Sequence, residues 1–342
     1  MSSKKAKKPL YEQSTQFRHW RFSSSQLENI RTQTNASAVE RVKRLLTEES
    51  ALRETEQTDS PRPPPEEIPY LIADEELALC RYYEAMIRNF PGANFPDEVK
   101  ATAIVYMKRF YLRNSIMDYH PKTIMMTCLF LGAKTENNII AISDFLNIIE
   151  RISREKISRD TIFRHELPVS QSMRFEYAVH HPYRASFGFF LDLQNFTKDL
   201  TKLKRIYEKS KEYIGTSLLT ELVFIYQPSQ IALATIRLAT KTLETKLDIN
   251  GYIRSKFPDK HEKLTDILDD IENTLTNFSP VSKDQAKEID RKLHFCRNPE
   301  KNPNSALSKK RRADKQRERE VRKTKRLKTL RDQQKELESV FQ

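Results

Sequence analysis

The sequence predicts an all-α protein built from two tandem five-helix repeats, with further helices at both ends. Only five glycines occur among the 342 residues, so neither tight hairpins nor a glycine-rich phosphate-binding loop is expected. Apolar residues recur at helical spacing behind residues that commonly cap helix N-termini. Two strongly apolar segments, 119–135 and 226–242, also share a sequence pattern. Together these features indicate stacked helices rather than a nucleotide-binding α/β fold.

The N-terminal part of the chain divides into three segments. Residues 1–16 are expected to be disordered, since they are polar and basic and carry no sustained apolar pattern. Residues 17–52 are predicted to be helical, because Ser25 and Glu28 form a capping-box pattern ahead of helically spaced apolar residues. Residues 53–73 hold five prolines and are predicted to form a linker, since proline fixes φ and lacks a backbone N–H.

The first repeat is predicted over residues 74–178. Its central helix begins at Pro121 and is apolar nearly all round, which is typical of a helix surrounded by other helices. Pro168 lies within the last helix and should kink or shorten it. The five helices are expected at 75–90, at 99–112, at 122–134, from 143 onward, and at 158–177.

A second repeat is predicted over residues 182–279, because the chain repeats itself at an offset of 107. Residues 119–135 read YHPKTIMMTCLFLGAKT, and residues 226–242 read YQPSQIALATIRLATKT. Both segments place a proline at the first helical position, where proline is favoured. One more helix is expected behind the second repeat, at 280–297.

Positive charge is concentrated in the tail, residues 298–342, which is predicted to be partly disordered or helical. The chain has a net charge of +13, and residues 309–331 hold thirteen lysines and arginines against three acidic residues. A solvated tail without a specific partner is one interpretation. A nuclear-import signal or a weak nucleic-acid contact is the other, suggested by the cluster Lys309, Lys310, Arg311 and Arg312.

Neither a cofactor, nor a metal, nor a membrane-spanning segment is expected. The three cysteines are far apart, so no pair has zinc-ligand or redox spacing, and buried thiols are predicted. His180 and His181 are adjacent but have no further ligand at a suitable spacing. No serine or cysteine lies in a motif that supplies a base, so the chain is not expected to be an enzyme.

Several segments resemble the cyclin family, and cyclin H within it. They are RHWRFSS at 18–24, ALCRYYEAMI at 78–87, MKRFYLRNSIMDYHPKTIMMTCLFLGAKT at 107–135, HHPYRASFGFFLDL at 180–193 and YQPSQIAL at 226–233. The resemblance extends over about residues 17–297. It implies two tandem cyclin folds, with the N- and C-terminal helices packed on the first repeat.

The resemblance also implies a regulatory role. Cyclins of this kind bind and activate the catalytic subunit of a cyclin-dependent kinase of the CDK-activating type. The implied nuclear complex includes a RING-finger assembly factor and the core of general transcription factor IIH. Its expected products are phosphorylated kinase activation loops and phosphorylated C-terminal repeats of RNA polymerase II.

Four residues match kinase-binding positions of the family. The resemblance pairs Lys134, at the end of the first central helix, with Glu166 in the fifth helix, and implies that both hold the kinase's mobile regulatory helix. An ordinary surface ion pair is the alternative. Phe175 and Tyr177 match apolar kinase-contacting positions, although burial in the core is an equally good expectation for an aromatic side chain.

A transcription scaffold is the alternative function, because general initiation factors of the IIB type also resemble tandem cyclin folds. Such a scaffold would bind nucleic acid through the basic tail. Those factors carry an N-terminal zinc ribbon, and the first seventy residues here lack its four Cys/His ligands. The segment 99–103 also departs from the Met-Arg-Ala-Ile-Leu motif of cell-cycle cyclins, so docking of Arg-x-Leu substrates is not expected.

Overall fold

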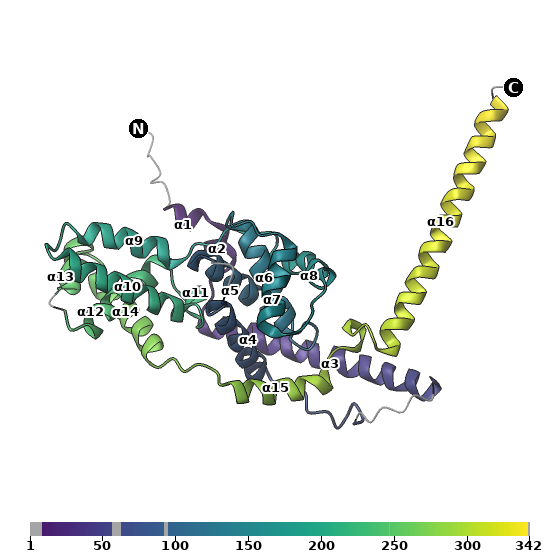
Figure 1. Ribbon diagram of the computed structural model, residues 1–342, viewed down its shortest axis with the longest axis horizontal. Helices are drawn as coiled ribbons and strands as arrows, with labels where there is room; N and C mark the ends of the chain where they lie inside the picture. Colours follow the sequence, from purple (N-terminus) through teal and green to yellow (C-terminus); the bar gives the residue numbers. More distant parts are fainter. Residues whose placement is uncertain (1–8, 57–62, 92–94, 246, 341–342) are drawn as a thin grey trace.

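The computed structural model describes residues 9–56, 63–91, 95–245 and 247–340, and every regular element within these ranges is helical. Figure 1 shows two helical bundles side by side, crossed by one long helix, with a second long helix projecting from the body. This arrangement confirms the prediction of an all-α protein with two tandem repeats and added terminal helices.

The first repeat is organised around the central helix α6. Its residues from Ile124 to Ala133 are all buried, because helices surround it on every side. Within α8, Pro168 is accommodated, and the helix ends at Ser172, five residues before the predicted end. The five helices are α4 (Ala73–Arg88), α5 (Asp97–Tyr111), α6 (Pro121–Thr135), α7 (Ile142–Ser153) and α8 (Arg159–Ser172).

The second repeat is built in the same way around α12, which begins at Pro228. Its core is separate from that of the first repeat, and apolar side chains of α9, α10, α12, α13 and α14 fill it. A single extra turn, α11, connects α10 to the central helix. The six helices are α9 (Pro182–Leu193), α10 (Leu200–Ser217), α11 (Leu222–Ile225), α12 (Pro228–Thr242), α13 (Ile249–Lys256) and α14 (His261–Thr276).

The N-terminal segment is more ordered than its sequence predicts. The expectation of disorder over 1–16 fails from residue 9 onward, where α1 (Leu10–Gln13) and α2 (Thr15–His19) form, and residues 1–8 lie outside the described part. The physical reason is a long-range contact, since the Gln16 side chain exchanges two hydrogen bonds with the backbone of His180. Tertiary partners of this kind stabilise helices that are too short to form alone.

A long helix, α3 (Ser24–Glu56), follows and crosses the first repeat (Figure 1). Leu27, Val42 and Leu46 are buried in the first core. The proline-rich segment predicted as a linker over 53–73 begins later than expected, because α3 continues to Glu56. Part of that segment, residues 57–62, lies outside the described residues, whereas Ile68 and Leu71 are buried in the core.

The C-terminal elements also pack on the first repeat. Helix α15 (Lys283–Cys296) lies against α4, and Ala286, Ile289 and Leu293 join the first core. A 3₁₀ turn (Pro299–Lys301) then leads into α16 (Ala306–Val340), which forms an exposed rod (Figure 1). The tail predicted as partly disordered or helical is therefore helical over these residues.

A buried ionic cluster joins the two repeats. Lys108 Nζ of α5 lies 2.8 Å from Glu84 Oε2 and 3.7 Å from Glu221 Oε1, and Glu221 comes from the second repeat. Arg31 of α3 and Arg81 of α4 also pair with Glu221. Burial opposes the charge on Glu221, but these three cations outweigh burial and lower its pKa to about 2. The cluster fixes the second repeat against three helices of the first half.

Candidate functional site

An ion pair between Lys134 and Glu166 stands at the surface of the first repeat. Lys134 is in the last turn of α6, where the helix dipole favours a cation, and Glu166 is in the middle of α8. The Lys134 side chain is 45% exposed and that of Glu166 is 24% exposed. The Lys134 ammonium also lies 5.6 Å from the centre of the Phe130 ring. A charged donor and a charged acceptor are thus held side by side and open to a partner.

Two exposed apolar side chains lie near this pair on α8. Phe163 and Leu167 lie on α8 four residues apart, on either side of Glu166 in sequence, and Phe163 contacts the Phe130 ring at 6.4 Å between centroids. Sequence reasoning did not single them out. One feature of the sequence could have identified them. They are two large apolar residues at (i, i+4) spacing, and they lie outside the buried face of α8 that Ile162 and Val169 define. We call Lys134, Phe163, Glu166, Leu167 and Phe175 the α6–α8 surface.

Phe175 is presented by an unusual backbone turn directly after α8. Arg174 and Phe175 both adopt left-handed conformations, with φ of 56° and 58°. The Phe175 N–H donates to the Ser170 carbonyl at 2.8 Å, which stabilises the turn. The side chain is 55% exposed. Non-glycine residues adopt this conformation at a cost of about 1–2 kcal/mol each. Two in succession explain why α8 ends before the predicted Tyr177.

Tyr177, the second aromatic residue of the predicted site, packs inward. Its ring lies 6.2 Å from that of Tyr106, and the Tyr106 hydroxyl donates to the Tyr177 carbonyl at 2.6 Å. Its side chain is partly buried against the first core. The four predicted residues therefore fall into two groups. Lys134, Glu166 and Phe175 lie at the surface, whereas Tyr177 packs beneath the segment that carries Phe175.

The N-terminal helix α2 holds this segment in place. Glu176 accepts hydrogen bonds from Trp20 Nε1 at 2.7 Å and from His19 Nδ1 at 2.6 Å. The buried Arg109 donates to the Glu176 carbonyl at 2.9 Å and stacks over the Trp20 ring at 4.8 Å. Burial lowers the pKa of Arg109 to about 10, so it remains a cation at neutral pH. Residues far apart in sequence thus position Phe175.

The second repeat carries an equivalent pair in a different setting. Lys241 of α12 is the counterpart of Lys134, and its Nζ lies 2.6 Å from Glu272 of α14. Here the carboxylate is only 8% exposed, and the buried Arg237 also pairs with it. The position of Arg237 is occupied by Phe130 in the first repeat. In the second repeat the glutamate is therefore part of an internal network and is not offered to a partner.

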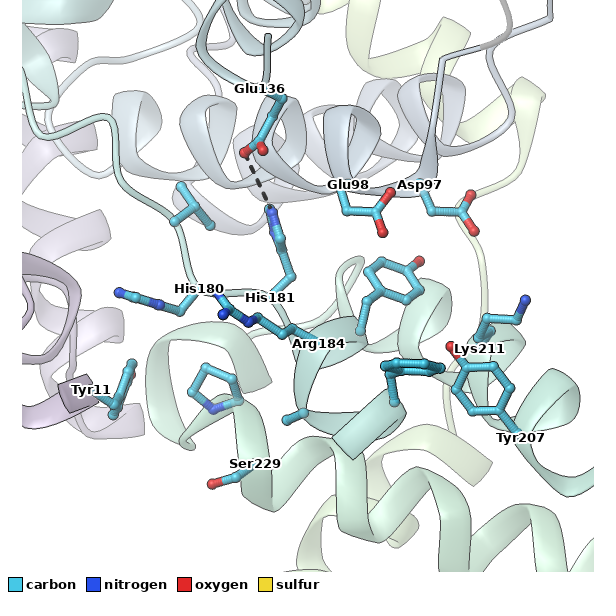
Figure 2. A pocket seen from close by; sticks show the side chains of 15 residues that line it. Tyr11, Asp97, Glu98, Glu136, His180, His181, Arg184, Tyr207, Lys211 and Ser229 are labelled. Atoms are coloured by element: carbon cyan, nitrogen blue, oxygen red, sulfur yellow. Dashed lines mark ion pairs between the residues drawn. The ribbon is translucent and has the colours of Figure 1, made fainter. Parts of the chain in front are cut away.

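A groove of about 750 Å³ lies between the two repeats (Figure 2). His180 and His181 point apart along its wall, because His181 Nε2 faces Glu136 at 3.5 Å whereas the His180 ring packs edge-on to Tyr11.

No group of three or more potential metal ligands occurs in the described part of the chain. The three cysteines are buried and unpaired, and burial raises the pKa of Cys296 to about 11.

Two family models match the repeats. The cyclin N-terminal domain model covers residues 79–178, and the cyclin C-terminal domain model covers residues 181–280. Cyclin-H of Xenopus laevis is 31% identical over 85% of this chain and 88% of its own length. Cyclin mcs2 of Schizosaccharomyces pombe is also 31% identical, over 89% of this chain and 90% of its own. The chain belongs to the cyclin H family.

Cyclin CCL1 of Saccharomyces cerevisiae is 34% identical over 73% of this cyclin. The match spans only 62% of the yeast protein. Two solved assemblies contain similar chains. The Chaetomium thermophilum CAK complex bound to ATP-γ-S gives a TM-score of 0.71 with 28% identity, covering 90% of this cyclin and 94% of that chain. The yeast TFIIK complex gives 0.61 with 31% identity, covering 78% and 100%.

None of the described helices of this cyclin is both long and apolar enough to cross a membrane. The strongly charged α16 is the longest of them.

Proposed function

We propose that this cyclin binds and activates the catalytic subunit of a cyclin-dependent kinase of the CDK-activating type, through the α6–α8 surface. The observation that carries the proposal is the exposed Lys134–Glu166 pair amid exposed apolar side chains. An interface needs apolar contact area together with a few well-placed polar groups, and this surface offers both. The CAK and TFIIK complexes named above, which contain similar chains, support the same partner class.

The chain acts on the kinase without supplying chemistry of its own. A kinase is active when its ATP-site lysine pairs with a glutamate of its mobile regulatory helix. A cyclin that binds only this arrangement shifts the kinase population toward it, by as much as its preference for that state allows. Lys134 can donate to carbonyls at the end of such a helix, and Glu166 can accept from its N–H groups, both as charge-assisted hydrogen bonds.

The wider assembly is part of the proposal. In it, the cyclin and its kinase work in the nucleus with a RING-finger assembly factor and the core of transcription factor IIH. Their substrates are kinase activation loops and the C-terminal repeats of RNA polymerase II. The support is the family membership and the yeast TFIIK complex, which consists of Kin28, Ccl1 and Tfb3.

Nuclear import is assigned to the basic cluster at the start of α16. Arg311 pairs with Glu48 and with Glu300, so this arginine is engaged with the body of the protein. Lys309, Lys310 and Arg312 are exposed and remain accessible to an import receptor. Replacing these three by glutamine should move a fluorescently tagged chain from the nucleus to the cytoplasm, whereas unchanged nuclear retention would contradict this role.

The decisive experiment is a reconstitution with a CDK-activating-type kinase subunit, with and without the RING-finger factor. Phosphorylation of a polymerase-repeat peptide is measured for the wild type, Glu166→Ala and Lys134→Ala. Lys241→Ala is the matched control, because it removes the equivalent lysine of the second repeat. We expect stimulation to fall about tenfold or more for the first two variants and to persist in the control.

Equal losses in all three variants would contradict the assignment of the interface to the first repeat. Absence of a complex, combined with salt-sensitive nucleic-acid binding, would favour the alternative of a tandem cyclin-fold transcription scaffold instead.

A further inference from the structure

We propose that α16 is a nucleic-acid-binding helix that contacts phosphates through one face, beyond the kinase-binding role proposed above. The face, here called the basic stripe, comprises Arg312, Lys315, Arg319, Arg322, Lys323 and Arg326.

The stripe follows from the helix geometry. Its residues recur at spacings of three and four, so at 3.6 residues per turn they fall within a sector of about 100°. From Arg312 to Arg326 the sector extends about 21 Å along the axis, at 1.5 Å per residue. The three acidic residues of this part of α16, Asp314, Glu318 and Glu320, all fall outside the sector. Positive charge on this face is therefore uninterrupted.

The stripe is also free. Every residue from 309 to 331 is exposed, and only the first turn of α16 is buried against the body, at Leu307 and Ser308. None of the six stripe side chains forms an ion pair with another described residue, whereas the neighbouring Arg311 does so twice. The six cations therefore remain available to an external anion.

The body holds α16 in a fixed direction. The carboxylate of Glu49 in α3 is 2% exposed, and it accepts the backbone N–H groups of Ala306 at 3.1 Å and Leu307 at 2.7 Å. A carboxylate at this position satisfies two of the helix's unpaired donors and complements its dipole. Figure 1 shows the result, a rod that projects clear of both repeats.

The chemistry of the stripe selects nucleic acid over other partners. A membrane-surface helix needs an apolar face, but the opposite side of α16 carries Lys310, Arg317 and Lys328. A protein interface needs a buried apolar centre, and the stripe has no apolar residue between Arg312 and Arg326. A polyphosphate backbone requires only a row of closely spaced cations, and its binding is driven by release of condensed counterions.

The same arrangement predicts a change in the helix on binding. Like charges three and four residues apart repel one another along the stripe and weaken the helix. Phosphates that neutralise them remove this repulsion. Bound nucleic acid should therefore increase the helical content of the chain, measured by circular dichroism at 222 nm.

The test uses the full chain and a fluorescently labelled 20-base-pair DNA duplex, an RNA duplex of the same sequence and the corresponding single strands. Anisotropy is recorded between 50 and 200 mM KCl. The stripe variant combines Lys315→Gln, Arg319→Gln, Arg322→Gln and Arg326→Gln. The matched control, Lys310→Gln, Arg317→Gln, Lys325→Gln and Lys328→Gln, removes the same charge from the rest of the helix surface.

We expect the stripe variant to lose at least tenfold in affinity, and the slope of log K against log salt to become shallower by about 3 to 4. The control variant should lose about threefold or less. Preference for DNA or for RNA would identify the natural ligand, and either supports the inference. Equal losses in both variants, no binding at 50 mM KCl, or equally tight binding of a polyglutamate peptide would overturn it. Kinase stimulation should be unaffected in the stripe variant, which separates this inference from the proposed function.

Discussion

Lys134 and Lys241 occupy the same position in the two central helices, 107 residues apart, and each pairs with a glutamate of the last helix of its repeat. Their surroundings differ at one decisive place, because Phe130 of the first repeat is replaced by the buried Arg237 in the second. Arg237 draws Glu272 into the interior, whereas Glu166 stays at the surface. The buried Arg237 thus holds Glu272 in an internal network, whereas the Lys134–Glu166 pair of the first repeat stays open.

The contrast between Phe175 and Tyr177 gives a first prediction. Phe175→Ala should weaken kinase binding by about 1–3 kcal/mol, because the exposed ring is available as an interface anchor. Its effect on the free energy of unfolding should stay within about 0.5 kcal/mol. Tyr177→Ala should destabilise the isolated chain by about 2–3 kcal/mol, since it removes packing against Tyr106. Calorimetric titration with the kinase and urea denaturation measure the two effects. A large stability loss for Phe175→Ala would show that the ring supports the fold instead.

Glu221 gives a pH-dependent prediction. Its pKa in the folded chain is about 2, against an ordinary value of 4.5, so its ionised form is favoured by folding. The stability that it supplies is complete above pH 5 and is lost as the pH falls toward 2. Glu221→Gln should therefore cost about 3 kcal/mol at pH 7, because Lys108, Arg31 and Arg81 lose their shared anion.

This difference in stability between the wild type and Glu221→Gln should fall to less than half of its value at pH 7 by pH 3, and it should approach zero only below pH 2. Urea denaturation of both proteins at pH 7, 5, 4 and 3 measures this difference in the free energy of unfolding. A difference that does not change with pH would mean that the carboxylate contributes through its shape and not its charge.

Glu49 is predicted to control the start of α16. Glu49→Ala should cost about 1–2 kcal/mol, since it leaves the N–H groups of Ala306 and Leu307 without their buried acceptor. Hydrogen exchange at these two amides should accelerate at least tenfold. The neighbouring Glu48→Ala is the control, because Glu48 pairs at the surface with the Arg311 side chain. Unchanged exchange in Glu49→Ala would place the anchor of α16 elsewhere.

Trp20 is predicted to connect the N-terminal helix to the kinase-binding surface. Trp20→Phe keeps an aromatic ring for Arg109 but removes the hydrogen bond from Nε1 to Glu176. We expect a loss of about 1 kcal/mol in stability. Kinase affinity should also decrease, because the segment carrying Phe175 is held less firmly. Measuring both in the same preparation tests the connection, and a stability loss with fully retained affinity would refute it.

The sequence predicts best what depends on local pattern. Pro121 and Pro228 begin the two central helices where their fixed φ and missing N–H favour a helix start, and the apolar runs after them are buried as predicted. Resemblance to the cyclin family pairs Lys134 with Glu166, and the structure brings these two side chains into contact.

Features that depend on distant partners were not predictable. The helices at 10–19 form because Gln16 meets His180, and α8 ends early because Arg174 and Phe175 take left-handed conformations. No sequence pattern near Glu49 predicts that its side chain caps a helix that begins 257 residues later. Phe163 and Leu167 are apolar residues on an exposed face, a signal that is visible only once the buried face of α8 is known.

The contacts of α3 also set an order of events during synthesis. This helix is translated early, but two of its partners are translated much later. Arg31 pairs with Glu221, and Glu49 accepts the N–H of Ala306. The ribosome must therefore release most of the polypeptide before the first long helix can complete its contacts. A product truncated before residue 306 leaves the Glu49 carboxylate without two of its donors, so incomplete chains should be less stable than the full chain.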